Sequence, residues 1–234
     1  MDIVRNYDVD GMHFDFIRYP MKFFPDDASY RRYGNGMSKA DWRRENINTF
    51  VKMFHDSAVA FKPMLKIGSA PIGIYDRTLF RNTLHSYEDV YQDSRRWLKE
   101  RWMDYLVPQV YWSLSSKPGN PDFANVVKEW SEYTFGRHVY IGIGAYKQEV
   151  NDQLPMLIDS IRSYQMPGEA FFRYEHIRDE LQLGRRYAYP ANVPPMLWKD
   201  SIPPNPPLQL AVQNTTDDIF ELRWKPPLPA TDGD

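Results

Sequence analysis

An acid, an imidazole and a guanidinium lie close together in residues 7–20, which read Tyr-Asp-Val-Asp-Gly-Met-His-Phe-Asp-Phe-Ile-Arg-Tyr-Pro. If this segment is a strand, His13 and Asp15 share one face. The opposite face carries the apolar side chains of Met12, Phe14 and Phe16. A carboxylate at the carboxyl end of a strand occupies the position from which (β/α)8 enzymes carry out acid–base chemistry. A structural polar group satisfied inside the fold is the alternative, and both interpretations stay open.

Two further polar side chains, Arg18 and Tyr19, follow Asp15 directly, and we assign both to substrate binding. Arg18 would hold Asp15 in its ionised form, or it would bridge to the carboxylate as scaffolding. His13 would hydrogen-bond a substrate or Asp15, with a structural hydrogen bond to a backbone carbonyl as the alternative.

Candidates for binding also follow the later predicted strands. Gln109 and Tyr111 share one face of a strand over residues 105–112, and Trp112 ends it. Tyr146 and Lys147 follow a strand over residues 139–145. An amide, phenols and an indole suit sugar hydroxyls and sugar rings, although core packing also accounts for such residues.

A second carboxyl group is needed for hydrolysis of a glycosidic bond, because two carboxyl groups flank the scissile bond in most such enzymes. The candidates are Glu149, after the strand over residues 139–145, and Glu175, after a strand over residues 170–174. Asp76, after a strand over residues 65–70, is a third. Each is alternatively a solvated loop charge.

The elements that must position these groups alternate between strand and helix, which is typical of parallel βαβ units. Helices are predicted over residues 38–61, with Ser38 as N-cap, from residue 86 through residue 98, over residues 121–135, and after a cap at Asn151. A loop is expected over residues 21–37. Glycines 142 and 144 share a face with Tyr146 and leave space for a substrate or a bulky neighbour such as Phe172.

Composition excludes several classes of function. The formal charge of −2 offers no electrostatic case for binding nucleic acid, and no apolar run is long enough to span a membrane. The chain has no cysteine, which excludes thiol catalysis. Its five histidines lack metal-ligand spacing. We therefore expect no metal and no cofactor.

The composition changes near residue 187. We predict a partial barrel over residues 1–187, a proline-rich linker over 188–205 and a truncated module over 206–234 with two antiparallel strands. Because only five strand–helix units are predicted, we expect the given sequence to begin inside a barrel domain and to end inside the second module. Unpaired strand edges would then favour self-association.

Several segments together resemble the glycosyl hydrolase-like 10 family. Residues 7–20 resemble its fourth-strand motif, and the later matches follow in the expected order at residues 42–48, 66–73, 93–98, 104–112 and 140–147. Residues 203–229 are similar to the start of a fibronectin type III module. The family includes a divisome-associated lipoprotein that acts on peptide-free peptidoglycan strands.

The resemblance implies an α/β fold, namely the carboxyl-terminal part (about strands four to eight) of a (β/α)8 TIM barrel. It also implies an extracytoplasmic protein that cleaves a β-linked glycan, peptidoglycan being the expected substrate, by carboxylate catalysis without a metal. A non-catalytic barrel that binds cell-wall glycan is the first alternative. A purely structural fragment without activity of its own is the second.

Overall fold

The computed structural model describes residues 1–20, 23–114, 120–178, 183–184, 186–216 and 219–229. The chain divides into two compact units, Met1–Pro194 and Pro195–Asp234, and each is considered by itself. No helix of the described residues combines the length and the apolar character that crossing a bilayer requires.

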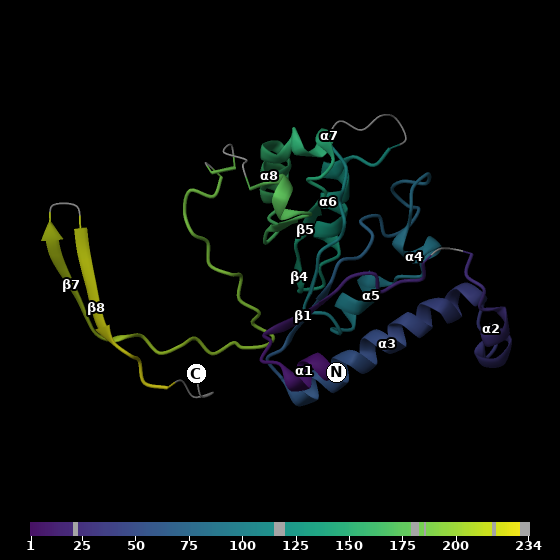
Figure 1. Cartoon of the computed structure of the whole chain (residues 1–234), viewed down its shortest axis with the longest axis horizontal. Helices are drawn as coiled ribbons and strands as arrows, with labels where there is room; N and C mark the ends of the chain where they lie inside the picture. Colours follow the sequence, from purple (N-terminus) through teal and green to yellow (C-terminus); the bar gives the residue numbers. More distant parts are fainter. Residues whose placement is uncertain (21–22, 115–119, 179–182, 185, 217–218, 230–234) are drawn as a thin grey trace. The chain divides into compact units, whose positions relative to one another are not determined.

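The first unit is built on parallel strands (Figure 1). One sheet has the order β1-β2-β3-β4, and a second sheet pairs β5 with β6. The strands are β1 (Gly11–Phe14), β2 (Lys66–Ser69), β3 (Tyr105–Leu106), β4 (His138–Val139), β5 (Ile141–Ile143) and β6 (Glu169–Phe171). Isolated parallel bridges from Gln109 to Ile72 and to Gly142 connect the two sheets. The expected α/β fold with the parallel sheet of a partial TIM barrel is confirmed, and the described strands form no closed barrel.

Helices flank these strands along the chain (Figure 1). They are α1 (Asp2–Asn6), α2 (Asp27–Tyr33), α3 (Lys39–Phe61), α4 (Ser86–Asp89), α5 (Ser94–Lys99), α6 (Phe123–Glu132), α7 (Gln148–Asn151), α8 (Leu154–Ser163) and the 3-10 helix η1 (Tyr174–His176). The longest, α3, begins as predicted, because the Ser38 side chain accepts a hydrogen bond from the backbone N–H of Asp41 (3.1 Å).

The core lies between strands and helices. Alternate strand residues are fully buried against the helices: Ile67, Leu106, Val139, Ile141 and Ile143. Two tryptophans complete this layer with satisfied indole groups. Trp97 Nε1 donates to Asn48 Oδ1 and Trp130 Nε1 donates to the carbonyl of Gly73, both at 2.7 Å. The apolar layer therefore has a defined packing, and it leaves the opposite face of the strands for other side chains.

Several predicted elements are wrong in their bounds. The helix predicted from residue 86 to 98 is two helices, because Tyr91 takes a positive φ of 57° and breaks the run. The strand over residues 139–145 is divided, because Tyr140 N–H bonds to Leu106 whereas Ile141 N–H bonds to Gly168. The strand over residues 105–112 loses its regular ladder at Pro108, which has no N–H to donate.

Two further expectations are corrected. Residues 21–37 are not one loop, since the described part contains α2. Asn151 does not cap a helix start: its side chain lies at the end of α7 and donates to the carbonyls of Ala145 (3.1 Å) and His176 (3.0 Å). The next helix, α8, starts after Gln153 with Pro155 in its first turn, a position where the missing N–H costs nothing.

The second unit contains an antiparallel hairpin of β7 (Leu208–Thr216) and β8 (Ile219–Lys225). Val212 lies opposite Leu222 across the pair. The side chains of Leu210, Phe220 and Trp224 are exposed. An assignment of this hairpin to a fibronectin type III module stays a prediction.

Candidate functional site

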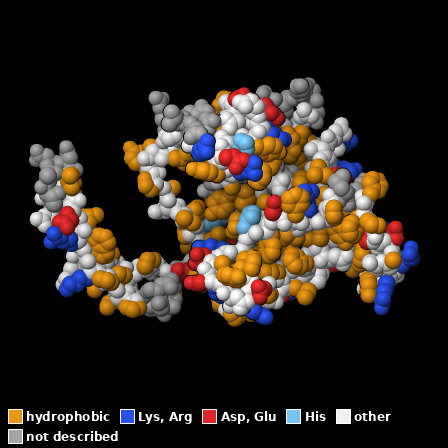
Figure 2. Space-filling model, viewed as in Figure 1, with side chains coloured by type: hydrophobic (Ala, Val, Ile, Leu, Met, Phe, Trp, Pro, Cys, Tyr) orange, Lys and Arg blue, Asp and Glu red, His pale blue; other side chains and the backbone are white. Residues whose placement is uncertain are grey.

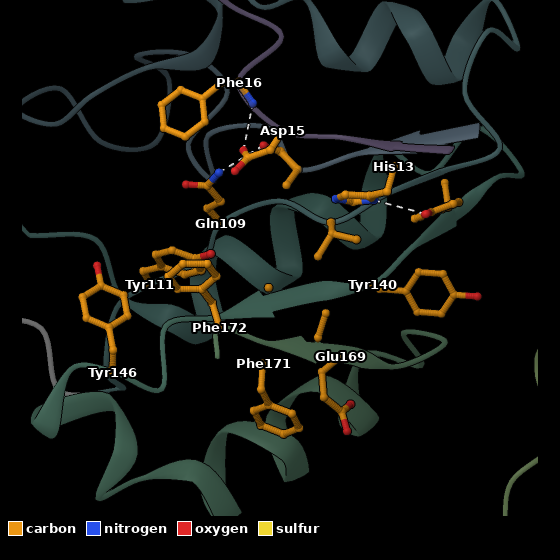
Figure 3. Close-up of a pocket in the computed structure, with 15 residues that line it drawn as sticks. His13, Asp15, Phe16, Gln109, Tyr111, Tyr140, Tyr146, Glu169, Phe171 and Phe172 are labelled. Atoms are coloured by element: carbon orange, nitrogen blue, oxygen red, sulfur yellow. Dashed lines mark hydrogen bonds between the residues drawn. The ribbon is translucent and has the colours of Figure 1, made fainter. Parts of the chain in front are cut away.

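A cavity of about 680 Å³ lies on the inner face of the strands. Figure 2 shows hydrophobic side chains gathered in the middle of the visible face of the first unit. Five residues predicted from the sequence line it, namely His13, Asp15, Gln109, Tyr111 and Tyr146. The strands alternate their side chains, so the residues that do not pack against the helices converge here. Figure 3 shows how these side chains project into the space.

Asp15 follows the last residue of β1 directly, at the carboxyl end of the strand. Its Oδ1 accepts the backbone N–H of Phe16 (2.8 Å). Phe16 takes a positive φ of 56°. The expectation that Phe16 packs with Met12 and Phe14 on the helix side is therefore wrong: the turn moves its ring to the cavity, where 68 % of the residue is exposed. Phe14 does pack there, edge-on against Phe54 of α3.

His13 and Tyr105 form a pair on the cavity wall. His13 Nδ1 lies 3.1 Å from the Tyr105 hydroxyl, and the two rings stack with centroids 5.6 Å apart. Burial lowers the pKa of His13, and the negative charge of Asp15 partly opposes this effect. Burial also raises the pKa of Tyr105. Near neutral pH the pair is therefore uncharged, and it can donate and accept hydrogen bonds.

Tyr111, Tyr146 and Phe172 form an aromatic cluster at the same end of the sheet as Asp15 (Figure 3). The rings of Tyr111 and Phe172 are stacked, with centroids 6.1 Å apart, and Tyr146 meets both edge-on. Burial and the charge of Asp15 raise the pKa of Tyr111 to about 12. Asp15 therefore acts electrostatically on a phenol that stays protonated at neutral pH.

Glycine makes room for this cluster. A Cβ atom at Gly144 would lie 2.8 Å from Tyr111 Cγ, so the tyrosine ring occupies the space beside Gly144. Lys147 Nζ donates to the backbone carbonyl of Tyr111 (2.8 Å) and fixes that segment. Gln109 donates from Nε2 to the carbonyl of Ala70 (3.1 Å), which fixes its amide at the cavity wall. These two bonds hold the backbone of Tyr111 and the amide of Gln109 in place.

The remaining predicted binding residues do not line this cavity. Arg18 and Tyr19 line a neighbouring cavity of about 290 Å³. Trp112 is half-buried and packs against the apolar core. Lys147 is engaged with the backbone as described above.

The predicted second acids also lie outside the cavity. Glu149 is exposed in the first turn of α7. Glu175, in η1, forms an ion pair with Arg173, and its carboxylate lies 3.7 Å from His176 Nε2. Asp76 accepts the backbone N–H of Thr78 (2.8 Å).

Glu169 lines the cavity and was missed from the sequence, because the strand was predicted to begin one residue later. It pairs with Ile141 at the amino end of β6, whereas Asp15 follows the carboxyl end of β1. Glu169 Oε1 accepts a hydrogen bond from the Tyr187 hydroxyl, and Figure 3 shows its carboxylate directed away from Asp15. Among the described residues, no group of three potential ligands is placed to hold a metal.

Comparison with known proteins gives a consistent result. Residues 1–159 match the family model Glycosyl hydrolase-like 10. Glycosyl hydrolase YngK of Bacillus subtilis (strain 168) is 31 % identical, over 96 % of this chain and 50 % of that protein. Glycosyl hydrolase DigH of Escherichia coli (strain K12) is 32 % identical, over 62 % of this chain and 36 % of that protein. The chain thus spans half or less of the curated relatives it matches, and it belongs to the Glycosyl hydrolase-like 10 family.

Proposed function

We propose that the protein cleaves O-glycosidic bonds in a β-linked glycan outside the cytoplasm, with peptidoglycan strands as the substrate. The observation that carries the proposal is the position of Asp15, which follows the carboxyl end of a parallel strand and lines an aromatic cavity. The family, and the name glycosyl hydrolase given to its relatives, support the same reaction class.

The cavity residues fit a sugar ring. Tyr111, Tyr146 and Phe172 offer aromatic faces on which the apolar face of a sugar packs. Gln109 and the His13–Tyr105 pair offer neutral donors and acceptors for hydroxyl and acetamido groups. In this proposal Asp15 serves as the general acid or base, or as the nucleophile, at the anomeric carbon.

A binding barrel without catalysis is the second candidate, and one observation favours it. Two catalytic carboxyl groups lie roughly 5–10 Å apart in glycosidases. Within the described part of the chain, the other carboxylate of the cavity is Glu169, which lies at the opposite end of the strands and is bonded to Tyr187. A barrel with Asp15 alone would bind glycan and release no product.

The decisive experiment measures both properties. The chain is assayed as it is, and as a chimera that replaces the matching region of Bacillus subtilis YngK, with peptide-free peptidoglycan strands as substrate. New reducing ends report cleavage, and co-sedimentation with insoluble glycan reports binding. The variants are Asp15→Asn and, as a matched control, Asp10→Asn, an exposed acid directly before β1.

The proposal predicts that Asp15→Asn lowers the release of reducing ends by about 100-fold or more, while Asp10→Asn leaves it unchanged. Circular dichroism verifies that both variants are folded. Binding without release in every protein would support the binding barrel. Neither binding nor release would contradict both candidates.

A further inference from the structure

Arg18 lies beside the Asp15 cavity and lines a second one. Its guanidinium stacks over the ring of Phe16, 4.5 Å from the ring centroid, and Phe16 itself lines the Asp15 cavity. On its other side, Arg18 lines the neighbouring cavity of about 290 Å³ together with Tyr19, Pro20, Phe24 and Ile47. One aromatic ring therefore separates a carboxylate site from a cation site.

Among the described residues, the guanidinium of Arg18 takes part in no ion pair or side-chain hydrogen bond, and it contacts the Phe16 ring. Burial lowers the pKa of Arg18, and the negative charge of Asp15 partly opposes this effect through space. An arginine keeps its proton at neutral pH under such influences. A half-buried cation that forms no ion pair with the described residues is a place where a ligand anion is favoured.

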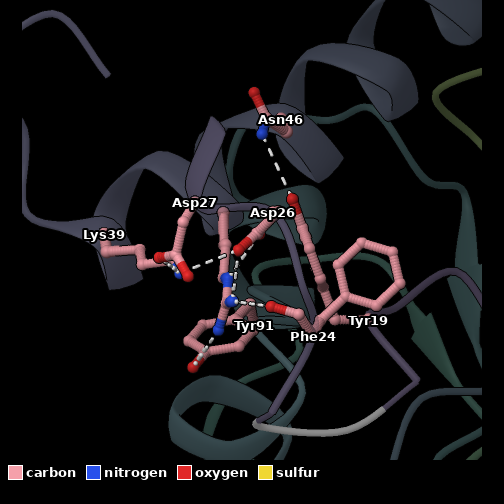
Figure 4. Close-up of polar contacts among 8 residues, drawn as sticks. Tyr19, Phe24, Asp26, Asp27, Lys39, Asn46 and Tyr91 are labelled. Atoms are coloured by element: carbon pink, nitrogen blue, oxygen red, sulfur yellow. Dashed lines mark hydrogen bonds and ion pairs between the residues drawn. The ribbon is translucent and has the colours of Figure 1, made fainter. Parts of the chain in front are cut away.

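Arg43, whose guanidinium lies 5.3 Å from the centroid of the Tyr19 ring, has a structural role that contrasts with Arg18; Figure 4 shows three of its partners, Asp26, Phe24 and Tyr91. Its guanidinium is buried and forms a two-bond ion pair with Asp26. It also donates to the Tyr91 hydroxyl and to the carbonyl of Phe24, each at 2.9 Å. Arg43 therefore anchors the segment that follows β1, and Arg18 is not needed for that task.

The backbone around Arg18 is held on both sides. The carbonyl of Ile17 accepts a hydrogen bond from Gln92 Nε2 (3.0 Å). The N–H of Tyr19 donates to the carbonyl of Val90 (3.1 Å), and the Tyr19 hydroxyl accepts from Asn46 (3.2 Å). Since these bonds fix the chain before and after Arg18, the cation is presented in a preorganised position.

We propose that Arg18 binds a carboxylate carried by the sugar unit next to the one that occupies the Asp15 cavity, and that it thereby selects acidic glycans. The inference rests on the proposed function and deepens it. A guanidinium forms paired hydrogen bonds with a carboxylate, and a neutral sugar offers no such group. The carboxylate belongs either to a lactyl ether or to a uronate, and the experiment separates these sources.

The experiment measures dissociation constants by calorimetry for four probes. Soluble peptide-free peptidoglycan strands carry lactyl carboxylates, and the same strands after carbodiimide amidation are neutral. Hyaluronan oligosaccharides carry uronates, and chitohexaose carries no acid. The full 234-residue chain is compared with two variants. Arg18→Gln removes the positive charge, and Arg18→Lys keeps the charge but lacks the planar guanidinium that forms paired hydrogen bonds.

Arg32→Gln is the matched control, because Arg32 is an exposed arginine that also stacks on a neighbouring ring, that of Tyr33 at 5.2 Å. We expect the chain to bind one acidic probe about 10- to 100-fold more tightly than the neutral probes. Arg18→Gln should abolish this preference and leave the binding of chitohexaose unchanged. Arg18→Lys should retain part of the preference, and Arg32→Gln all of it.

Equal binding of acidic and amidated strands by the wild-type chain would overturn the inference. An equal loss of affinity for all probes in Arg18→Gln would also overturn it, because that result is the signature of a structural role. Cleavage of glycan without any acidic preference would refute the role of Arg18 and leave the proposed function standing. A preference for acidic probes that depends on Arg18, without any cleavage of glycan, would support the role of Arg18 and refute the proposed hydrolysis.

Discussion

The ion pair between Asp26 and Arg43 makes a quantitative prediction about stability. Both side chains are almost completely buried, with 6 % and 5 % exposed. Arg43 donates to Asp26 through Nε (2.8 Å) and through Nη2 (2.6 Å). Mainly through these bonds, and with a further contribution from Lys39 Nζ at 2.9 Å, the pKa of Asp26 falls from 3.8 to about 2, although burial opposes the shift. The variant Asp26→Asn removes the charge and leaves Arg43 buried without its carboxylate.

The expected loss follows from the pKa. Since one pKa unit corresponds to ~1.4 kcal/mol, the lowered pKa represents about 2.5 kcal/mol of stability at neutral pH. Removal of one partner of a buried pair costs ~3–5 kcal/mol in other proteins. Arg43 keeps its bonds to Tyr91 and to Phe24, which moderates the cost. We therefore expect Asp26→Asn to lower the free energy of unfolding by about 2–3 kcal/mol.

The dependence on pH has a definite sign. The folded-state pKa of Asp26 is lower than the unfolded one, so the unfolded chain takes up the proton first as the pH falls. The stabilisation is complete above about pH 5 and is lost as the pH falls through 3.8 towards 2. The difference between wild type and Asp26→Asn should shrink to about half at pH 3.

Urea unfolding followed by tryptophan fluorescence at several pH values between 3 and 7 measures this difference. Asp27→Asn is the matched control, because Asp27 is the next residue and pairs with Lys39, but 70 % of its side chain is exposed. It should leave the free energy of unfolding nearly unchanged, because solvent screens the exposed pair. Equal losses in the two variants, or a loss at Asp26 that does not change with pH, would refute the reasoning.

Three other predictions concern the cavity and the sheet. Gly73→Ala would place a Cβ atom 2.3 Å from the carbonyl oxygen of Gln109, and we expect a loss of ~1–3 kcal/mol in urea unfolding; wild-type stability would show that the backbone yields there without cost. Titration of His13 by NMR should give a pKa below 6.5, and Asp15→Asn should lower it further, because the carboxylate opposes the effect of burial; a higher pKa in the variant would contradict this assignment. Since the unfolded chain binds this proton at the higher pH, the His13 contribution to stability should decline as the pH falls below about 6.5. The outer edges of β1 and β6 pair with no described strand, so the chain should self-associate; sedimentation as a monomer over a wide concentration range would refute this expectation.

Much of the fold could be predicted from local patterns. Alternating strand-like and helix-like segments predicted the parallel sheet, and Ser38 followed by Asp41 predicted the start of α3. The lengths of strands could not be predicted, because they depend on partners elsewhere in the chain. The strand over residues 139–145, for example, is divided where the hydrogen-bond partner changes between Tyr140 and Ile141, and no local feature of its sequence predicts this change.

Part of the candidate site could likewise be predicted from the sequence, and part could not. The period of two predicted that His13 and Asp15 share a face, and both line the cavity. The position of Phe16 depends on a turn with positive φ, which apolar residues rarely adopt and which hydrophobic pattern alone does not indicate. Glu169 was not predicted as a cavity residue, because the predicted strand begins at residue 170 and β6 begins one residue earlier. The boundaries of elements are the feature that is hardest to predict from a sequence.

The alternation of side chains along the strands also has an evolutionary consequence. Ile67 and Leu106 belong to the apolar layer, whereas Ala70, Gln109 and Ala170 face the cavity from the same or adjoining segments. A mutation at one of these cavity positions changes the shape or polarity of the space and leaves the apolar layer intact. Substitutions at such positions can therefore change which ligand the cavity accepts at little cost in stability, so members of one family can diverge in ligand while keeping the same scaffold.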